Sequence, residues 1–220
     1  MKITAVLFDM DGVLYDSMPL HAKAWARSFN EYGVKISAKS VYEAEGMTEM
    51  EAAVFIARSA KLNLPQTDIN KIIVKKNRFY DKFPRPRLIK GAKSLIRYLQ
   101  KYDYGICVVT GSSQGKTLAR LKKDFGIERH TVVTGKDVRR GKPHPEPFLK
   151  ALKKLKVPAK FAVVIENAPL GIESAKRAKI KCIALNTGPF QKRELIKRGA
   201  SFVVKDCAEL LKLFGKIKSF

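Results

Sequence analysis

The chain has 220 residues, of which 45% are hydrophobic, so it can bury one core with room for a second, smaller domain. Its 44 Lys and Arg residues outnumber 20 Asp and Glu residues, which sets a formal net charge of +24. No apolar stretch reaches the roughly 18 residues of a membrane-spanning helix, so no membrane span is expected.

The basic residues are spread over nearly every predicted helix and form neither a low-complexity tail nor a known nucleic-acid-binding motif. Such a surface attracts polyanions in general, including nucleic acid, acidic membranes and phosphorylated metabolites. Because no motif or tail concentrates the charge, we expect no dedicated nucleic-acid partner. We also expect a monomer with no membrane partner. A nucleic-acid-binding protein without catalysis is the alternative that the charge supports.

The N-terminus and the cysteines both indicate a cytoplasmic protein. Met1-Lys2 runs directly into the first predicted strand, which leaves no room for a signal peptide. Cys107, Cys182 and Cys207 lie in apolar segments, are odd in number and form no Cys-Xaa-Xaa-Cys pair. We therefore expect buried, reduced thiols and no metal site built on them.

The first predicted element is a buried strand, the apolar run 3–8, which leads into Asp9-Met10-Asp11-Gly12. Side chains two apart on a strand share a face, so Asp9 and Asp11 should project together at its C-terminal end. Two carboxylates so close repel each other unless a cation or a proton lies between them, which suits a reaction site. The alternative is a plain turn, since Asp and Gly favour turn geometry.

Residues 16–85 are predicted to form an all-helical insertion with its own small core. Ser17, followed by Pro19, is typical of a helix start. Thr48 and Glu51 have the spacing of a capping box ahead of a further helix. Apolar residues continue at helical spacing until a Pro-Xaa-Pro stretch ends the pattern.

From Gly91 onward, predicted strands and helices alternate. Continuous apolar strands separated by helices imply a parallel sheet covered on both faces. With the first strand, this makes about six strands in a doubly wound, Rossmann-like α/β core of residues 1–15 and 86–220, which carries the helical cap as an insertion. Ligands in such folds bind beyond the C-terminal strand ends. The further strands are expected at 104–109, 131–133, 161–165, 182–185 and 202–204.

The strand at 104–109 is followed by Thr110-Gly111-Ser112-Ser113. Hydroxyls and a glycine before a helix start can form a small anion nest, in which backbone N–H groups and the Thr110 hydroxyl hold phosphate oxygens. An ordinary helix N-cap is an equally good interpretation of this segment taken alone.

Lys142 lies in a proline-rich segment, Gly141-Lys142-Pro143-His144-Pro145-Glu146-Pro147. Because the prolines restrict the backbone, Lys142 is expected on a stiff turn just before a helix. A rigidly placed ammonium group would stabilise the crowded negative charge of two carboxylates and a phosphate. A loop lysine is ordinarily solvated, and only the stiffness argues otherwise. His144 is expected to be structural.

Glu166 and Asn167 follow the strand at 161–165 and offer hard oxygen ligands. Such ligands suit Mg²⁺, which few protein groups hold together with substrate phosphate and water. A helix cap by Asn167 is the alternative. A carboxylate nucleophile, a second carboxyl group as acid/base, an anion nest, a fixed lysine and oxygen ligands together predict phosphoryl transfer through an aspartyl-phosphate.

These segments occur in the order and spacing of the haloacid dehalogenase superfamily. More narrowly, the chain resembles the beta-phosphoglucomutase-like phosphatases with a helical cap. The segments around Asp9, Thr110, Lys142 and Glu166 carry the resemblance, which covers essentially the whole chain. It implies hydrolysis of phosphoric monoesters with Mg²⁺ as cofactor.

The resemblance also implies a role for each residue. Asp9 would attack phosphorus, and Asp11 would protonate the leaving oxygen and later activate water. The implied phosphoryl-binding residues are Thr110, Gly111, Ser112 and Lys142. The implied Mg²⁺ ligands are a carboxylate oxygen of Asp9, the backbone carbonyl of Asp11, and the pair Glu166 and Asn167.

Two positions depart from the family pattern. Asn167 stands where many relatives have Asp, so we expect weaker Mg²⁺ affinity, not its loss. In the cap segment Gly46-Met47-Thr48-Glu49, Glu49 stands where the mutases have an arginine that grips the second phosphate of a sugar bisphosphate. A glutamate there would repel that phosphate, which favours a phosphatase over a mutase.

The cap residues expected near the substrate are His21, Gly46, Thr48, Glu49 and Arg78. His21 resembles a cap-entry histidine that is linked to proton relay. Arg78 or Lys76 is the candidate to replace the missing arginine, and this keeps the mutase as an alternative. Because a helical cap encloses a small chamber, we expect the partner to be a small phosphorylated metabolite, such as a sugar phosphate.

Two further activities are disfavoured. A phosphonate hydrolase would need a desolvated cap lysine as a Schiff base, and the sequence marks none of Lys23, Lys75 and Lys76 as desolvated. A dehalogenase would leave Asp11 and the Mg²⁺ residues without a task.

Overall fold

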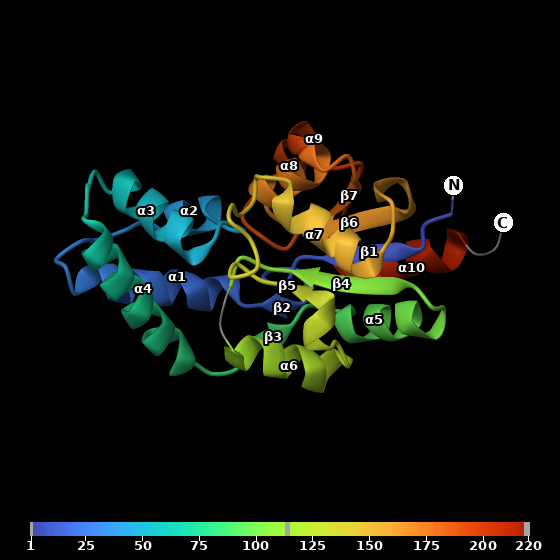
Figure 1. Ribbon diagram of the computed structural model, residues 1–220, viewed down its shortest axis with the longest axis horizontal. Coiled ribbons are helices and arrows are strands. Elements are labelled where there is room, and N and C mark those ends of the chain that lie inside the picture. Colours follow the sequence, from blue (N-terminus) through green and yellow to red (C-terminus); the bar gives the residue numbers. More distant parts are fainter. Residues whose placement is uncertain (1, 113–114, 218–220) are drawn as a thin grey trace.

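A computed structural model describes residues 2–112 and 115–217 and contains a six-stranded parallel sheet (Figure 1). The strands lie in the order β5-β4-β1-β6-β7-β8, so the first strand of the chain is central. Every neighbouring pair is parallel, which confirms the predicted doubly wound α/β core. The strands are β1 Ala5–Phe8, β4 Gly105–Val109, β5 Val132–Val133, β6 Ala162–Glu166, β7 Lys181–Leu185 and β8 Phe202–Val204.

Each central strand has apolar side chains on both sides, and helices cover both faces of the sheet and bury them. In β1, Val6 and Phe8 belong to one hydrophobic cluster while Ala5 and Leu7 belong to the other. The first cluster lies under α5 Ala92–Lys101, α6 Gly115–Phe125 and α10 Cys207–Ile217. The second lies under α7 Glu146–Leu155, α8 Pro169–Arg177 and α9 Lys192–Arg198. Short 3-10 turns at Arg129–Thr131 and Ala159–Phe161 precede β5 and β6.

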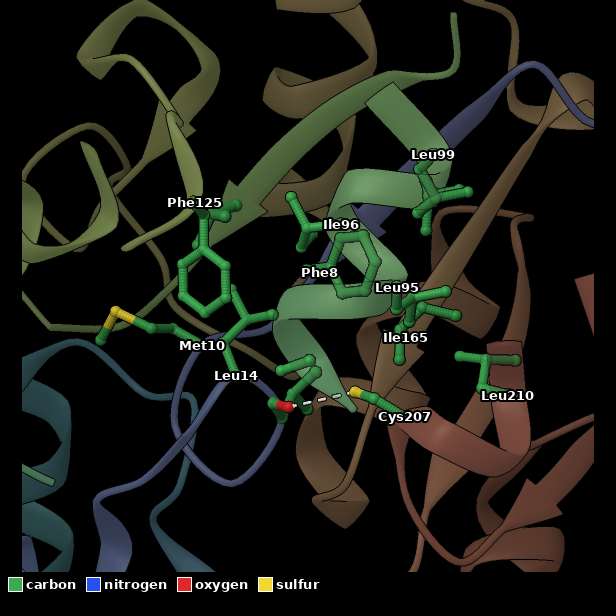
Figure 2. Close-up of a cluster of buried hydrophobic side chains, with 14 of the residues drawn as sticks. Phe8, Met10, Leu14, Leu95, Ile96, Leu99, Phe125, Ile165, Cys207 and Leu210 are labelled. Carbon is green, nitrogen blue, oxygen red and sulfur yellow. Dashed lines mark hydrogen bonds between the residues drawn. The ribbon is translucent and has the colours of Figure 1, made fainter. Parts of the chain in front are cut away.

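Figure 2 shows part of the first cluster, in which Phe8 packs among side chains of α5 and Phe125 of α6. The Cys207 thiol also lies here and donates to the backbone oxygen of Val13 at 3.5 Å. Cys107, Cys182 and Cys207 are all buried and free, as their apolar surroundings predict. Within the described ranges, no helix has the length and apolarity to cross a membrane.

Four helices form the inserted cap, beyond the C-terminal ends of the strands (Figure 1). They bury a third hydrophobic cluster of their own, centred on residues such as Trp25, Phe29 and Ile56. The capping box that the spacing of Thr48 and Glu51 predicts is present at the start of the third helix. The helices are α1 Met18–Asn30, α2 Ala38–Glu43, α3 Glu49–Ser59 and α4 Gln66–Asp81.

A two-stranded antiparallel ribbon, which the sequence pattern does not reveal, joins the two chain crossings between core and cap. It pairs β2 Tyr15–Asp16 with β3 Arg87–Leu88. Two residues per strand are too few to show a period of two. Next to the ribbon, Asp124 of α6 accepts from the Tyr15 hydroxyl at 2.8 Å and from Arg85. One core carboxylate therefore holds both crossings.

Candidate active site

Three neighbouring strand ends and one loop bring the predicted residues together. Asp9 follows β1, Thr110 follows β4 and Glu166 ends β6. Lys142 comes from the loop between β5 and α7. All four side chains are buried, as is expected where the C-terminal ends of parallel strands are covered by an inserted domain.

Lys142 lies between two carboxylates. Its ammonium group donates to Asp9 Oδ1, to Glu166 Oε1 at 2.7 Å and to the carbonyl oxygen of Val109 at 3.1 Å. Burial lowers the pKa of Lys142, but Asp9 and Glu166 outweigh it and hold that pKa above its ordinary value. The lysine is therefore a fixed cation whose exposed fraction is 1%, and the solvated alternative does not describe it.

Glu166 uses both of its carboxylate oxygens within the protein. Oε1 accepts from Lys142, and Oε2 accepts from the backbone N–H groups of Asn167 and Ala168 at 2.8 and 3.0 Å. A side chain on Gly171 would collide with this carboxylate, since its Cβ would lie 1.7 Å from Oε1. Asn167 makes no cap bond to α8, whose N-cap is Ala168. Glu166 thus positions Lys142 and the turn before α8.

Asp11 is held by hydroxyls and a histidine. Its Oδ1 accepts from Ser17 at 2.5 Å and lies 3.2 Å from His21 Nε2, while Oδ2 accepts from Thr110 Oγ1 at 3.3 Å. Burial raises the pKa of Asp11, but His21 and the hydrogen bonds outweigh it, so the pKa lies below its ordinary value. Ser17, predicted as a helix start, precedes α1 without capping it by its side chain, because its hydroxyl is bonded to Asp11.

The pKa of Asp9 is shifted in the opposite direction to that of Asp11. Its pKa is well above the ordinary value, chiefly because of burial and despite the nearby Lys142. One of its oxygens, Oδ2, is buried and has no hydrogen-bond partner in the described part of the chain. Two carboxylates two residues apart therefore differ in how readily they ionise, and a cation at the unpartnered Oδ2 of Asp9 would favour its ionised form.

Glu45 is a site residue that sequence reasoning did not include. It comes from the turn after α2 in the cap, is buried, and accepts from Asn167 Nδ2 at 2.9 Å. Its pKa is raised well above the ordinary value by burial and then by the charge of Asp9. Its position directly before Gly46 is the only sequence signal, since a cap turn beside a capping box gives no hint of reaching the core.

The segment after β4 is closed by its own contacts and by the cap. The Ser112 N–H donates to Thr110 Oγ1 at 3.0 Å. A side chain on Gly111 would collide with the carbonyl oxygen of Met47, at 2.1 Å, so the cap turn lies directly on this glycine. The Ser112 hydroxyl is buried without a partner among the described residues, and Ser113 lies outside them.

A cavity of about 60 Å³ lies between the sheet edge and the cap. Asp9, Asp11, Gly111 and Ser112 line it from the core. From the cap it is lined by His21, Gly46, Glu49 and Lys76 together with apolar side chains such as Trp25 and Met47. The cavity is therefore lined by core and cap together.

The cap residues expected near the substrate need two corrections. Arg78 is exposed and does not line the cavity, since residues two apart on α4 face different directions. Thr48 does not line it either, because its hydroxyl belongs to the capping box. Lys76, in contrast, is desolvated: it is 2% exposed, donates to Glu49 Oε1 at 2.9 Å and lies 5.3 Å from the Trp25 ring.

The unpaired oxygens fit a hard cation. Asp9 Oδ2, Asn167 Oδ1 and Glu45 Oε2 are buried, and none has a hydrogen-bond partner within residues 2–112 and 115–217. Burying such groups unpaired is costly, and carboxylate and amide oxygens are the ligands that Mg²⁺ takes. Over the same residues, no three His, Cys, Asp or Glu side chains form a metal cluster, so an amide oxygen would have to share the site.

Known proteins are similar to this chain in sequence and in fold. The chain is 28% identical over 209 residues to the phosphorylated carbohydrates phosphatase of Thermotoga maritima, which covers 91% of this chain and 94% of the relative. It is 32% identical over 183 residues to the validoxylamine A 7'-phosphate phosphatase of Streptomyces hygroscopicus subsp. limoneus, covering 82% and 84%.

Among solved structures, a provisionally named beta-phosphoglucomutase of Bacteroides vulgatus superposes with a TM-score of 0.91 at 36% identity, covering 99% of this chain and 90% of that one. A family model described as haloacid dehalogenase-like hydrolase matches residues 6–185, a range that starts in β1 and ends with β7. The chain belongs to the family of haloacid dehalogenase-like hydrolases.

Proposed function

We propose that this hydrolase is a Mg²⁺-dependent phosphatase that cleaves a small phosphorylated metabolite, such as a sugar phosphate, through an aspartyl-phosphate on Asp9. The observation that carries the proposal is the pairing of an unpartnered Asp9 oxygen with an Asp11 carboxylate that is fully hydrogen-bonded, in one cavity that core and cap residues line together. The similarity to two named phosphatases supports it.

In this mechanism Asp9 attacks the phosphorus atom of the bound ester. Lys142 lies against Asp9 and is held by Glu166, so its positive charge lies beside Asp9 when the cap is docked. A preorganised cation beside the developing charge stabilises the transition state without reorganisation. Gly111 and Ser112 line the chamber and Thr110 is bonded to Asp11 beside it, and the three would bind phosphoryl oxygens.

Asp11 would deliver a proton to the leaving oxygen and later take one from water. His21 Nε2 lies 3.2 Å from Asp11 Oδ1, a distance over which the two groups can exchange a proton. The His21 ring is stacked on Tyr80 with the ring centroids 4.2 Å apart, which fixes its orientation. Once the leaving group departs, the same pair accepts the proton of the attacking water.

A bound Mg²⁺ would supply charge neutralisation for the phosphoryl oxygens. Asp9 Oδ2 and Asn167 Oδ1 would hold it, since both oxygens are unpartnered, and the Asp11 backbone carbonyl is a further ligand that the family resemblance implies. Glu166 would act behind them, because its oxygens are already bonded. Glu45 Oε2 is also buried without a partner. Its carboxylate would supply the negative charge that is missing because residue 167 is Asn and not Asp.

A mutase is the second candidate, because Lys76 is a buried cation in the chamber and could hold a second phosphate. Glu49 speaks against it, since its carboxylate is bonded to the Lys76 ammonium and offsets that charge. A phosphate of a sugar bisphosphate would have to displace Glu49. We therefore place the phosphatase first.

We further propose that residues 16–85 are the cap and that 1–15 and 86–220 are the core. The separate hydrophobic cluster of α1–α4 and the ribbon at the two crossings support this division.

The test is a phosphate-release assay over a panel of sugar phosphates, with and without Mg²⁺, on the wild type and on Asp9→Asn. We expect Mg²⁺-dependent release by the wild type and none by the variant. Beta-glucose 1-phosphate with a bisphosphate primer is the mutase control. Accumulation of glucose 6-phosphate without free phosphate would show that the protein is a mutase and not a phosphatase.

A further inference from the structure

The loop that carries Lys142 is held partly by the core and partly by the cap. The core part is Glu146 at the start of α7, whose carboxylate accepts from the backbone N–H groups of Arg139 and Arg140 at 3.1 Å each. The next two N–H groups, those of Gly141 and Lys142, are bonded to the cap. The backbone of this loop is therefore bonded to the core up to Arg140 and to the cap from Gly141 onward.

Glu51 of α3 provides the first of the two cap partners. Its Oε2 accepts from the Gly141 N–H at 3.0 Å and its Oε1 lies 3.2 Å from the same nitrogen. Oε2 also accepts from the N–H and the hydroxyl of Thr48 at 2.9 and 2.7 Å, which closes the capping box of α3. One carboxylate therefore caps a cap helix and binds a core loop at once.

Gly46 provides the second cap partner, since its carbonyl oxygen accepts from the Lys142 N–H at 3.1 Å. The cap turn and the core loop approach so closely that neither glycine could carry a side chain. A Cβ on Gly141 would lie 2.5 Å from the Thr48 nitrogen, and one on Gly46 would lie 2.7 Å from Lys142 Cδ. The cap turn is therefore fitted to the backbone of this loop and not only to its surface.

We propose that Glu51 is a positioning residue for Lys142: its carboxylate couples the docking of the cap to the placement of the lysine-bearing turn. The inference rests on the proposed function, in which Lys142 stabilises the phosphoryl group. When the cap lifts, the Gly141 and Lys142 N–H groups lose their partners and the turn is free to move. Lys142 is then fully placed only while the chamber is covered, so the reaction is confined to the docked cap.

Substitutions at Glu51 separate this role from helix capping. Gln is also found at this position of capping boxes, so Glu51→Gln keeps the box and leaves a single neutral oxygen for Gly141. Glu51→Ala removes both. Ser37→Ala is the matched control, because Ser37 caps α2 within the same cap by accepting from the Ser40 N–H at 3.2 Å and its side chain has no hydrogen bond to the core among the described residues.

The experiment measures backbone amide exchange at residues 139–142, in the full chain with Mg²⁺ present, together with kcat and KM for phosphate release. For Glu51→Ala we expect exchange at Gly141 and Lys142 to rise about tenfold or more while Arg139 and Arg140 stay protected. We expect kcat to fall about tenfold with KM changed less, Glu51→Gln to recover part of both, and Ser37→Ala to alter neither.

Unchanged exchange at Gly141 and Lys142 in Glu51→Ala would overturn the proposal, as would equal losses in Ser37→Ala. If Glu51→Ala does not fold, the exchange of Glu51→Gln decides: protection equal to that of the wild type at both amides refutes the coupling. Because exchange needs no substrate, it tests the positioning even if the wild type releases no phosphate, and the two proposals fail separately.

Discussion

The cap meets the core at two places that differ in kind. At the hinge side, where the chain crosses between core and cap, Tyr15 and Arg85 bind Asp124 of the core helix α6. At the site side, Glu45, Gly46 and Glu51 bind buried parts of the catalytic loops. The hinge side decides where the cap is attached, whereas the site side decides whether the site is complete. The following predictions test this division.

Lys142→Met should have the largest effect, since it removes the cation that the core side of the site is built around. Asp9 and Glu166 would be left buried beside each other without a counterion. Breaking such a pair costs about 3–5 kcal/mol of stability, and losing one transition-state donor costs roughly 100- to 1,000-fold in kcat. Denaturant unfolding and phosphate release measure the two effects.

The matched control is Lys39→Met, because Lys39 forms an exposed pair with Glu43 on α2 and is worth under about 1 kcal/mol. A Lys142→Met protein as stable as this control would show that the buried carboxylates are neutral and need no ammonium group.

Glu45→Gln tests the cap's contribution to the proposed metal site. Without Mg²⁺ the variant should be more stable than the wild type at pH 7 by about 1 kcal/mol, because a buried carboxyl with a raised pKa is costly to ionise. With Mg²⁺ the order should reverse, since the wild type gains stability from the ion in proportion to its affinity. Thermal unfolding over a Mg²⁺ series measures both.

The sign of this effect with pH follows from the raised pKa of Glu45. Its folded pKa exceeds the ordinary 4.5, so the penalty is absent below about pH 4.5 and grows as the pH rises through the folded pKa. Glu43→Gln, at a half-exposed position of α2, should show neither the gain nor the reversal.

Asp124→Asn weakens the hinge side and should leave kcat within about threefold of the wild type. Burial raises the pKa of Asp124, but hydrogen bonds from Arg85 and Tyr15 outweigh it and hold the pKa below 3.8. The loss of these bonds should cost about 1–2 kcal/mol at pH 7. Because the folded pKa is lowered, this contribution is present above about pH 4 and disappears as the pH falls through the folded pKa.

Asp137→Asn is the comparison, since Asp137 is a carboxylate of the core that binds Arg129 and Thr134 away from the hinge. Both variants should be destabilised, but only Asp124→Asn should make the cap easier to detach in limited proteolysis at the crossings. Equal proteolysis of the two variants would show that Asp124 does not hold the two crossings in place.

Thiol labelling should give the smallest effect and report on the core alone, because the cysteines lie in the core and are buried. Burial raises the pKa of Cys107 and of Cys207 to about 12, so little thiolate is present at pH 7.5. Native protein should react with iodoacetamide to only a few per cent in an hour, including Glu51→Ala and Asp124→Asn. Fast labelling of either variant would show that the core opens together with the cap.

Much of the catalytic edge follows from local sequence. An apolar run followed by Asp9 and Asp11 predicts a strand end, and Thr110 and Glu166 follow two further such runs. Parallel strands bring their C-terminal ends to one edge, so these residues had to meet. Lys142 joins them from the proline-rich turn, where its side chain bonds to Asp9 and Glu166.

Other features have no local signal. Ser17 looks like a helix cap, yet its hydroxyl binds Asp11, because the chain reverses between them. Lys76 looks like one of many surface lysines, yet the packing of α3 against α4 buries it beside Glu49. Arg78, two residues on, is exposed. Whether a charged residue faces a cavity or solvent depends on rotation about the helix axis, which tertiary packing decides.

The sequence by itself determined the parallel core, the helical insertion and the residues of the strand ends, because these depend on hydrophobic period and on order along the chain. Only the tertiary structure decided how the cap takes part. Glu45 and Glu51 reach the Asn167 and Gly141 loops across more than eighty residues of chain, and contacts of that kind depend on how two separately packed units are docked. Local pattern carries no information about docking.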